Sequence, residues 1–378
     1  MIAVKVFITG KEVEEKFNVR SLLFLNACGK IKYKGDDLNF MKLIKQSNFR
    51  EELNSLLTEL RVEELTPVTC TEGQGYAKFF EKLYFKNDDL YMPFSDIPLS
   101  GGKVRQAIML MAENYDFIMN ECNSTVYTST GLSSPQGLII ARVAKEFGFK
   151  SVIFVGNTDA KGIRRNPMLV RALIDCKGFC NINIEAKMAF ESVLNSVIQK
   201  HRELGERFFY VRFGINLEDS PNAILNSVGY QVQNLPNDME YLIIPCGSCI
   251  SAASICKGLI TYRPDLAGRV KVLGIQISGY DRTDVMERIL GEDLSKVDFK
   301  LCISRDYDYH RAVKLPDYPN CDNGKPMDVL YEAKAWDYMM RYLMEDLRGK
   351  RVLFWKIGNS SDVRFSSVAD LLKGVKSV

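Results

Sequence analysis

Short hydrophobic runs alternate with longer amphipathic segments from about residue 124 onward. The runs are rich in β-branched and aromatic residues, which is typical of buried strands. They predict strands over 124–128, 151–155, 207–211, 240–244, 270–277 and 351–355, and the amphipathic segments predict helices over 136–147, 167–174 and 251–261. This alternation indicates an α/β fold with open, twisted, mostly parallel sheets and flanking helices. In such sheets, ligands bind beyond the carboxyl ends of the strands.

The first sixty residues follow a different pattern. Residues 1–8 are mostly apolar and lead into charged residues, so we expect a first strand rather than a signal peptide. Residues 30–50 carry several lysines with acidic residues among and just after them. That mixture favours a solvated helix face over a nucleic-acid-binding surface. No apolar run of the chain approaches the length of a membrane span, so no membrane partner is expected.

Composition adds limits on size, partners and compartment. The chain has 378 residues, of which 46% are hydrophobic, enough for two domains with their own cores. Its net charge of +3 does not demand a nucleic-acid partner. There are ten cysteines but only two histidines, and several cysteines lie in apolar runs such as 243–246. We therefore expect reduced, mostly buried thiols, no metal site, and a cytoplasmic protein.

Four separated segments are candidates for chemistry. In the first, Leu99-Ser100-Gly101-Gly102-Lys103, a strand is followed by a small-residue turn and a helix that opens with Lys103. A lysine at such a place could hold an aldehyde cofactor. On this segment alone, an exposed surface lysine is the simpler interpretation.

The second and third candidate segments each join a strand to a helix. Residues 128–137 offer hydroxyls and backbone N–H groups suited to a carboxylate, although an ordinary cap by Ser134 with Pro135 in the first turn is the alternative. In residues 245–253, small side chains let backbone amides converge on a phosphate. The alternative there is a tight turn without a ligand. The fourth segment, 328–335, is by itself an amphipathic helix start with Asp328 as its cap.

The order and spacing of these segments resemble the fold type II enzymes that use pyridoxal 5'-phosphate (PLP). The closest resemblance is to the branch of aminocyclopropane-carboxylate deaminase and D-cysteine desulfhydrase, over roughly residues 65–365. The matching motifs are Thr66-Pro67, Asp88-Asp89-Leu90, Gly101-Gly102-Lys103-Val104-Arg105-Gln106, Ser134-Pro135-Gln136, Gly247-Ser248-Cys249-Ile250-Ser251 and Asp328-Val329-Leu330-Tyr331-Glu332-Ala333-Lys334-Ala335.

The resemblance implies roles for the matching residues. Lys103 would form the Schiff base to PLP and shuttle a proton, and Ser134 would contact the substrate carboxylate. Tyr331 would help to deprotonate the substrate. Glu332 would face the pyridine nitrogen and deepen the electron sink, the alternative being a solvent-facing helix residue. The phosphate cradle would consist of Gly247, Ser248, Cys249, Ile250 and Ser251.

The resemblance also suggests two further site residues, and the chain differs from the family motifs at three places. Asn359 is expected to contact the cofactor, and Tyr309 is expected to face the site. Pro135 stands where an asparagine usually bonds the phenolic oxygen of PLP, and Cys249-Ile250 replaces two glycines. Lys356-Ile357-Gly358-Asn359 stands where the family often has His-Thr-Gly-Gly. These departures bear on the substrate more than on the cofactor.

The implied function is a PLP-dependent enzyme that acts on a small amino acid through a Schiff base and a carbanion, with lyase or deaminase chemistry favoured. The alternatives are β-replacement or transfer, a substrate carried on a nucleotide or another carrier, and a catalytically inactive binding relative. The implied architecture has a large domain of residues 65–103 and 216–378 and a small α/β domain of residues 104–215. Residues 1–64 would form an extension of the large domain, and the protein would be a homodimer.

Overall fold

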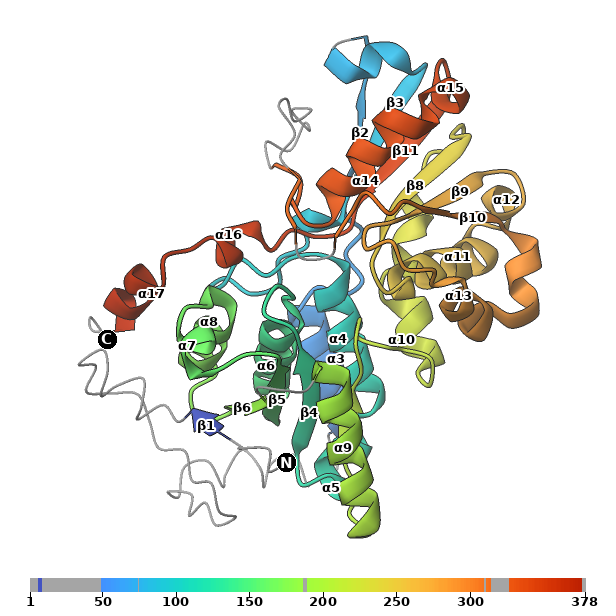
Figure 1. The fold of residues 1–378 in the computed structure, drawn as a ribbon. Helices are drawn as coiled ribbons and strands as arrows, with labels where there is room; N and C mark the ends of the chain where they lie inside the picture. Colours follow the sequence, from blue (N-terminus) through green and yellow to red (C-terminus); the bar gives the residue numbers. More distant parts are fainter. Residues whose placement is uncertain are drawn as a thin grey trace. The chain divides into compact units, whose positions relative to one another are not determined.

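Two open sheets organise the chain, as the computed structural model shows (Figure 1). The structure describes residues 6–8, 49–73, 75–185, 189–308, 311–313 and 326–375. The expected site residue Tyr309 lies outside these ranges. Unit 1 consists of residues 1–62, 114–212 and 364–378, and unit 2 consists of residues 63–113 and 213–363.

Unit 1 is built on a five-stranded sheet with the order β1-β6-β5-β4-β7. The strands are β1 (Val6–Ile8), β4 (Thr125–Thr130), β5 (Lys150–Gly156), β6 (Cys180–Glu185) and β7 (Phe209–Val211). β1 runs antiparallel to β6, and the other pairs are parallel. The helices are α3 (Phe49–Glu59), α5 (Tyr115–Glu121), α6 (Gln136–Glu146), α7 (Ala160–Arg164), α8 (Pro167–Asp175), α9 (Phe190–Glu203) and α17 (Val368–Val375). Both α6 and α9 pack on β5, which explains its nearly continuous hydrophobic sequence.

Unit 2 is built on a six-stranded sheet with the order β10-β9-β8-β11-β3-β2. The strands are β2 (Val68–Thr71), β3 (Lys82–Asn87), β8 (Tyr241–Cys246), β9 (Lys271–Gln276), β10 (Asp298–Ile303) and β11 (Arg351–Lys356). β2 runs antiparallel to β3, and the other pairs are parallel. The carboxyl ends of β9, β8, β11 and β3 therefore follow one another along the same edge of this sheet.

The helices of unit 2 connect these strands. They are α4 (Gly102–Glu113), α10 (Pro221–Asn226), α11 (Ile250–Tyr262), α12 (Pro264–Ala267), α13 (Thr283–Leu290), α14 (Glu332–Tyr338) and α15 (Met344–Leu347). α16 (Ser361–Arg364) ends at the boundary between the units. Short 3-10 helices span Gly75–Phe79, Asp88–Leu90, Gly229–Asn234 and Gly291–Lys296, and a π-helix spans Met339–Leu343.

The structure confirms the predicted α/β class and its mostly parallel sheets. The predicted strand over 151–155 lies within β5, and the predicted helix over 136–147 corresponds to α6. The units differ from the predicted domains, because α4 falls in unit 2, whereas β1, α3 and α17 fall in unit 1. The domain roles implied by the resemblance stay predictions.

Seven of the eight described cysteines are buried, and these eight thiols are free. Only Cys70 is exposed. The described residues contain no cluster of histidine, cysteine or acidic side chains that could bind a metal ion. Within the same ranges, no helix combines the length and the apolar character that crossing a membrane requires.

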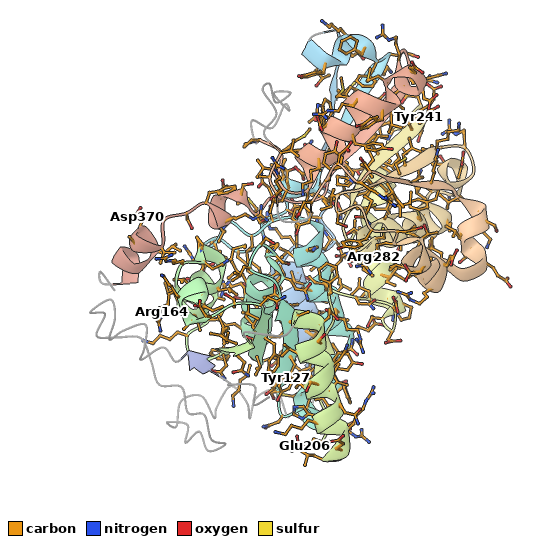
Figure 2. All side chains as sticks on the ribbon, viewed as in Figure 1. Tyr127, Arg164, Glu206, Tyr241, Arg282 and Asp370 are labelled. Carbon is orange, nitrogen blue, oxygen red and sulfur yellow. The ribbon has the colours of Figure 1, made fainter. Side chains whose placement is uncertain are left out.

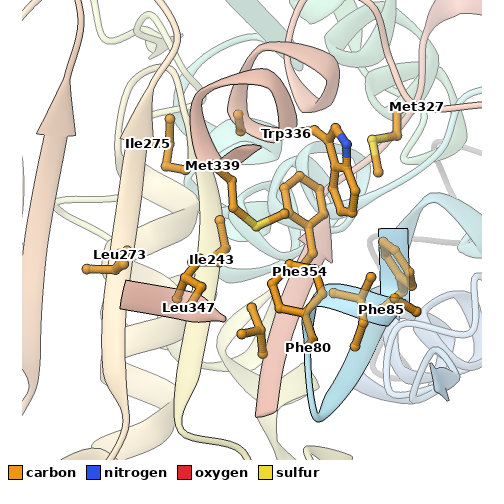
Figure 3. Packing of buried hydrophobic residues seen from close by; sticks show 14 of the residues in the cluster. Phe80, Phe85, Ile243, Leu273, Ile275, Met327, Trp336, Met339, Leu347 and Phe354 are labelled. Atoms are coloured by element: carbon orange, nitrogen blue, oxygen red, sulfur yellow. The ribbon is translucent and has the colours of Figure 1, made fainter. Parts of the chain in front are cut away.

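Trp336 of α14 belongs to a buried hydrophobic cluster in unit 2 (Figure 3). Its ring centroid lies 5.9 Å from that of Phe85 on β3 and 5.4 Å from that of Phe354 on β11. Ile243 of β8 and Met339 belong to the same buried cluster. This packing fixes α14 on the sheet, and α14 begins with Glu332.

We expect Trp336→Ala to lower the free energy of unfolding by about 3–5 kcal/mol, because it leaves a large cavity between α14 and two strands. Urea denaturation followed by circular dichroism measures this change. Leu204→Ala is the control, because that side chain is 60% exposed and its loss should cost less than about 0.5 kcal/mol. Equal losses in the two variants would contradict this account of the core.

Candidate functional site

Lys103 lies at the start of α4, which approaches the backbone that follows β11. Gly101 has φ +92°, and a Cβ atom there would lie 2.3 Å from the Cα atom of Gly358. The N–H group of Gly102 donates to the carbonyl oxygen of Ile357 at 2.8 Å. Only glycine fits at position 101, because the positive φ disfavours other residues and the Cα atom of Gly358 leaves no room for a Cβ atom. The two glycines before Lys103 therefore place it at the carboxyl edge of the sheet.

Tyr331 lies beside Lys103. The Nζ atom of Lys103 is 5.5 Å from the centroid of the Tyr331 ring, within the range of a cation–π contact. The Lys103 side chain is half-buried, and Tyr331 is buried. Asp328 fixes the turn before α14, because its Oδ1 atom accepts hydrogen bonds from the N–H groups of Leu330 and Tyr331.

Glu332 is fully buried, so the alternative interpretation of a solvent-facing helix residue is wrong. Its Oε1 atom accepts a hydrogen bond from the N–H group of Gly358 at 3.1 Å, and its Oε2 atom accepts one from Asp328 at 3.0 Å. Burial, and then the nearby Asp89 carboxylate, raise the pKa of Glu332 to about 8. The ammonium group of Lys356 acts in the opposite direction. Burial therefore favours the protonated form of this carboxyl group, and a cation placed against it would favour release of the proton.

Lys356 and Asp89 form a buried ion pair next to this carboxyl group. Their Nζ and Oδ2 atoms are 2.8 Å apart, and both side chains are fully buried. Lys356 ends β11 and Asp89 lies two residues after the end of β3, and these two strands pair in parallel. Both residues lie in segments that were compared with the family, but neither was expected in the site. The signal that could have found it is opposite charge at the carboxyl ends of two hydrophobic strands.

The loop between β8 and α11 contains the five residues expected to hold a phosphate. Cys249 has φ +63°, in the left-handed region that glycine adopts more readily than other residues. No side chain caps the first turn of α11. A Cβ atom on Gly214, which has φ +80°, would lie 2.3 Å from the Cβ atom of Ser248. The loop thus rests directly on the backbone of Gly214.

Gln106 connects this loop to the lysine helix. It follows Lys103 by one turn of α4, and its Nε2 atom donates to Oγ of Ser251 at 3.1 Å. Its Oε1 atom is buried and has no hydrogen-bond partner in the described part of the chain. Buried polar atoms are nearly always paired, so such an atom beside the loop fits a ligand-binding site. The sequence showed Gln106 only as part of the lysine motif.

Ser134 and Asn359, the other expected site residues that the structure describes, belong to different units. Ser134 is buried in unit 1, where its Oγ atom accepts a hydrogen bond from the N–H group of Gln136, the first residue of α6. Asn359 lies in unit 2, and its side chain binds the backbone of Pro326 and Ser361. Lys103, Tyr331, Glu332 and the loop of residues 247–251 also belong to unit 2.

Comparison with known proteins identifies one curated relative. No family model matches the chain. Over 246 residues, the chain is 26% identical to the O-seryl-dTMP PLP-dependent decarboxylase of Salmonella phage ViI. The match covers 61% of this chain and 56% of the phage protein, so the chain spans little more than half of that relative.

Solved structures resemble the chain over most of its length. The crystal structure of an ACC (aminocyclopropane-carboxylate) deaminase homologue has a TM-score of 0.57 and 16% identity, and covers 85% of this chain and 98% of its own. O-ureido-L-serine synthase has a TM-score of 0.56 and 14% identity, and covers 82% and 94%. At such identities, the likeness shows the fold.

Glu332→Gln tests the buried carboxyl group in the ligand-free protein. Between pH about 4.5 and about 8, folded Glu332 holds a proton that the unfolded chain releases. Its contribution to stability is therefore complete below that window and is lost as the pH rises through it. We expect the free energy of unfolding of Glu332→Gln, relative to wild type, to rise by a few kcal/mol between about pH 5 and about pH 8.

Urea denaturation at several pH values measures this difference. Glu345→Gln, which changes an exposed glutamate on α15, serves as the matched control. If both variants follow the wild-type pH dependence, Glu332 does not hold the proton.

Proposed function

We propose that this chain, which has the fold of the fold type II PLP enzymes, is a PLP-dependent enzyme acting on an amino acid or on a substrate that bears one. The observation that supports this most strongly is the placement of Lys103. Two glycine contacts hold it at the carboxyl edge of the unit 2 sheet, beside Tyr331. Through Gln106, the same helix is joined to the loop between β8 and α11.

The residues of unit 2 fit the chemical groups of PLP. The backbone amides of residues 247–251 and the uncapped start of α11 would hold the phosphate. The amine of Lys103 would hold the aldehyde, and the carboxyl group of Glu332 would face the ring nitrogen. Glu332 is buried, and the hydrogen bonds that it accepts in the described residues come from backbone N–H groups. Both features suit that role. PLP, when bound, supplies an electron sink for a bond broken at the α-carbon.

The protein's own groups would divide the remaining work. Lys103 would move the proton at the α-carbon, and Tyr331 would orient the lysine amine and assist that transfer. Glu332 would exchange a proton with the ring nitrogen, which its raised pKa makes accessible near neutral pH. Ser134 would contact the substrate carboxylate, and Asn359 and Tyr309 would complete the contacts to cofactor and substrate.

Lyase or deaminase chemistry is the reaction that we propose, because an acidic group at the ring nitrogen suits reactions that pass through a carbanion. The second candidate is decarboxylation of an amino acid carried on a nucleotide. It is favoured by the 26% identity to the phage protein, whose name gives such a substrate and reaction. β-Replacement would instead require a second, nucleophilic substrate. A cytoplasmic homodimer is part of the same proposal.

Lys103→Ala should abolish covalent attachment of PLP. We expect the wild-type protein to be yellow after loading with PLP, and borohydride reduction to fix the cofactor on the peptide that contains Lys103. Absorption spectra and peptide mass spectrometry measure both effects. The control is Lys78→Ala, which removes an exposed lysine of the same unit and should leave the colour unchanged. A colourless wild-type protein that takes up no PLP would exclude an active PLP enzyme. It would support the alternative of a catalytically inactive relative that serves as a binding protein.

Gly214→Ala should weaken PLP binding by about tenfold or more, because the added methyl group would displace Ser248. Gly349→Ala is the matched control: Gly349 also has a positive φ of +69°, but a Cβ atom there would meet nothing within 4 Å. Both variants share the cost of the left-handed backbone, and only Gly214→Ala disturbs the loop. Titration with PLP measures the difference, and equal affinities in the two variants would contradict a phosphate site in this loop.

A further inference from the structure

The segment that follows β9, residues 277–282, lies directly beside the loop proposed to hold the phosphate. β9 pairs with β8, and Gln276 is opposite Cys246. The N–H group of Ile277 donates to the carbonyl oxygen of Cys246 at 3.0 Å, and Nε2 of Gln276 donates to that of Gly247 at 3.2 Å. The start of this segment therefore lies next to the start of the loop between β8 and α11.

The same segment also begins next to the proposed catalytic groups. Ile277 packs against Leu330 and Tyr331 in a small buried cluster. The Tyr331 ring is in turn 5.5 Å from Nζ of Lys103. A molecule whose amino-acid part reaches Lys103 could therefore extend its remaining part toward residues 278–282.

Local contacts hold this segment in one shape. A Cβ atom on Gly279 would lie 3.2 Å from the carbonyl oxygen of Ser304, so the segment rests on the backbone after β10. Asp281 accepts hydrogen bonds from the N–H group and the hydroxyl of Thr283, at 2.9 and 2.7 Å, at the start of α13. Side chains on such a preorganised segment can bind a ligand with little loss of entropy.

Tyr280 and Arg282 are two of the side chains on this segment that reach the surface. Tyr280 is 66% exposed, which leaves much of its ring accessible to a ligand. Arg282 is half-buried, and its Nε atom is buried without a hydrogen-bond partner in the described residues. Figure 2 shows Arg282 at the end of the unit 2 sheet opposite to Tyr241, the first residue of β8. It thus lies at the edge where the carboxyl ends of the strands meet.

We propose that Tyr280 and Arg282 form a subsite for the nucleotide part of a nucleotide-linked amino acid. The Tyr280 ring would stack on the base, and the Arg282 guanidinium would pair with the phosphate. An exposed aromatic ring two residues from an arginine supplies the two contacts that a nucleotide needs and a small free amino acid does not. This inference rests on the proposed PLP-dependent function and names the class of its substrate.

Equilibrium binding of dTMP to the PLP-loaded protein tests the subsite without relying on turnover. We expect Tyr280→Ala to weaken binding of both dTMP and thymidine by about tenfold or more, because both contain the base. Arg282→Gln should weaken binding of dTMP by a similar factor and leave thymidine binding unchanged, because thymidine lacks the phosphate. Tyr280→Phe keeps the ring and should bind like wild type.

Tyr342→Ala and Arg348→Gln are the matched controls, since they remove an exposed tyrosine and an exposed arginine elsewhere in unit 2. Both should bind dTMP like wild type. The subsite is overturned if the PLP-loaded wild type does not bind dTMP, or if Tyr280→Ala and Arg282→Gln bind it as the controls do. Failure of the wild type to take up PLP would instead overturn the proposed function, so the two failures are distinguishable. Kinetics with O-seryl-dTMP should show the same losses as a rise in KM.

Discussion

The buried carboxyl group of Glu332 joins the parts of unit 2 on which the proposed site depends. Its two oxygens accept hydrogen bonds from the backbone of Gly358, after β11, and of Asp328, before α14. Gly358 in turn lies against Gly101, two residues before Lys103. One side chain thus fixes the turn that carries Tyr331 and the backbone that supports the lysine helix. Trp336, one turn along α14, secures the arrangement in the hydrophobic core.

The charged groups around Glu332 are costly to bury, and each has a partner in an ion pair or in hydrogen bonds. Asp89 pairs with Lys356, and Asp88 accepts hydrogen bonds from the indole of Trp355 and the hydroxyl of Thr66. Buried ion pairs contribute little to stability, because desolvation offsets their attraction. Here the Asp89–Lys356 pair adds two opposite influences on the pKa of Glu332. We interpret the pair as a means of keeping that carboxyl group able to exchange a proton.

The departures from the fold type II motifs affect the loop less than its sequence suggests. Cys249 adopts a left-handed backbone conformation, which glycine also adopts readily, and its side chain is buried. No side chain caps the start of α11. The segment of Tyr280 and Arg282, by contrast, belongs to none of the four motifs and presents an exposed aromatic ring. In the functions proposed above, the cofactor and the nucleotide part of the substrate would therefore bind to different parts of the same sheet edge.

The sequence by itself determined the α/β class, because hydrophobic periodicity is a local property that survives into the strands and helices. It also identified Lys103 and the loop of residues 247–251 as candidates. It did not predict β6 or β10, although Cys180–Glu185 and Asp298–Ile303 largely alternate apolar and polar residues, as half-buried strands do. Only the tertiary structure decided that Glu332 is buried, that Lys356 pairs with Asp89, and that Gln106 reaches Ser251. These contacts join residues far apart in the chain, and they follow from the order of the strands, which no local pattern contains.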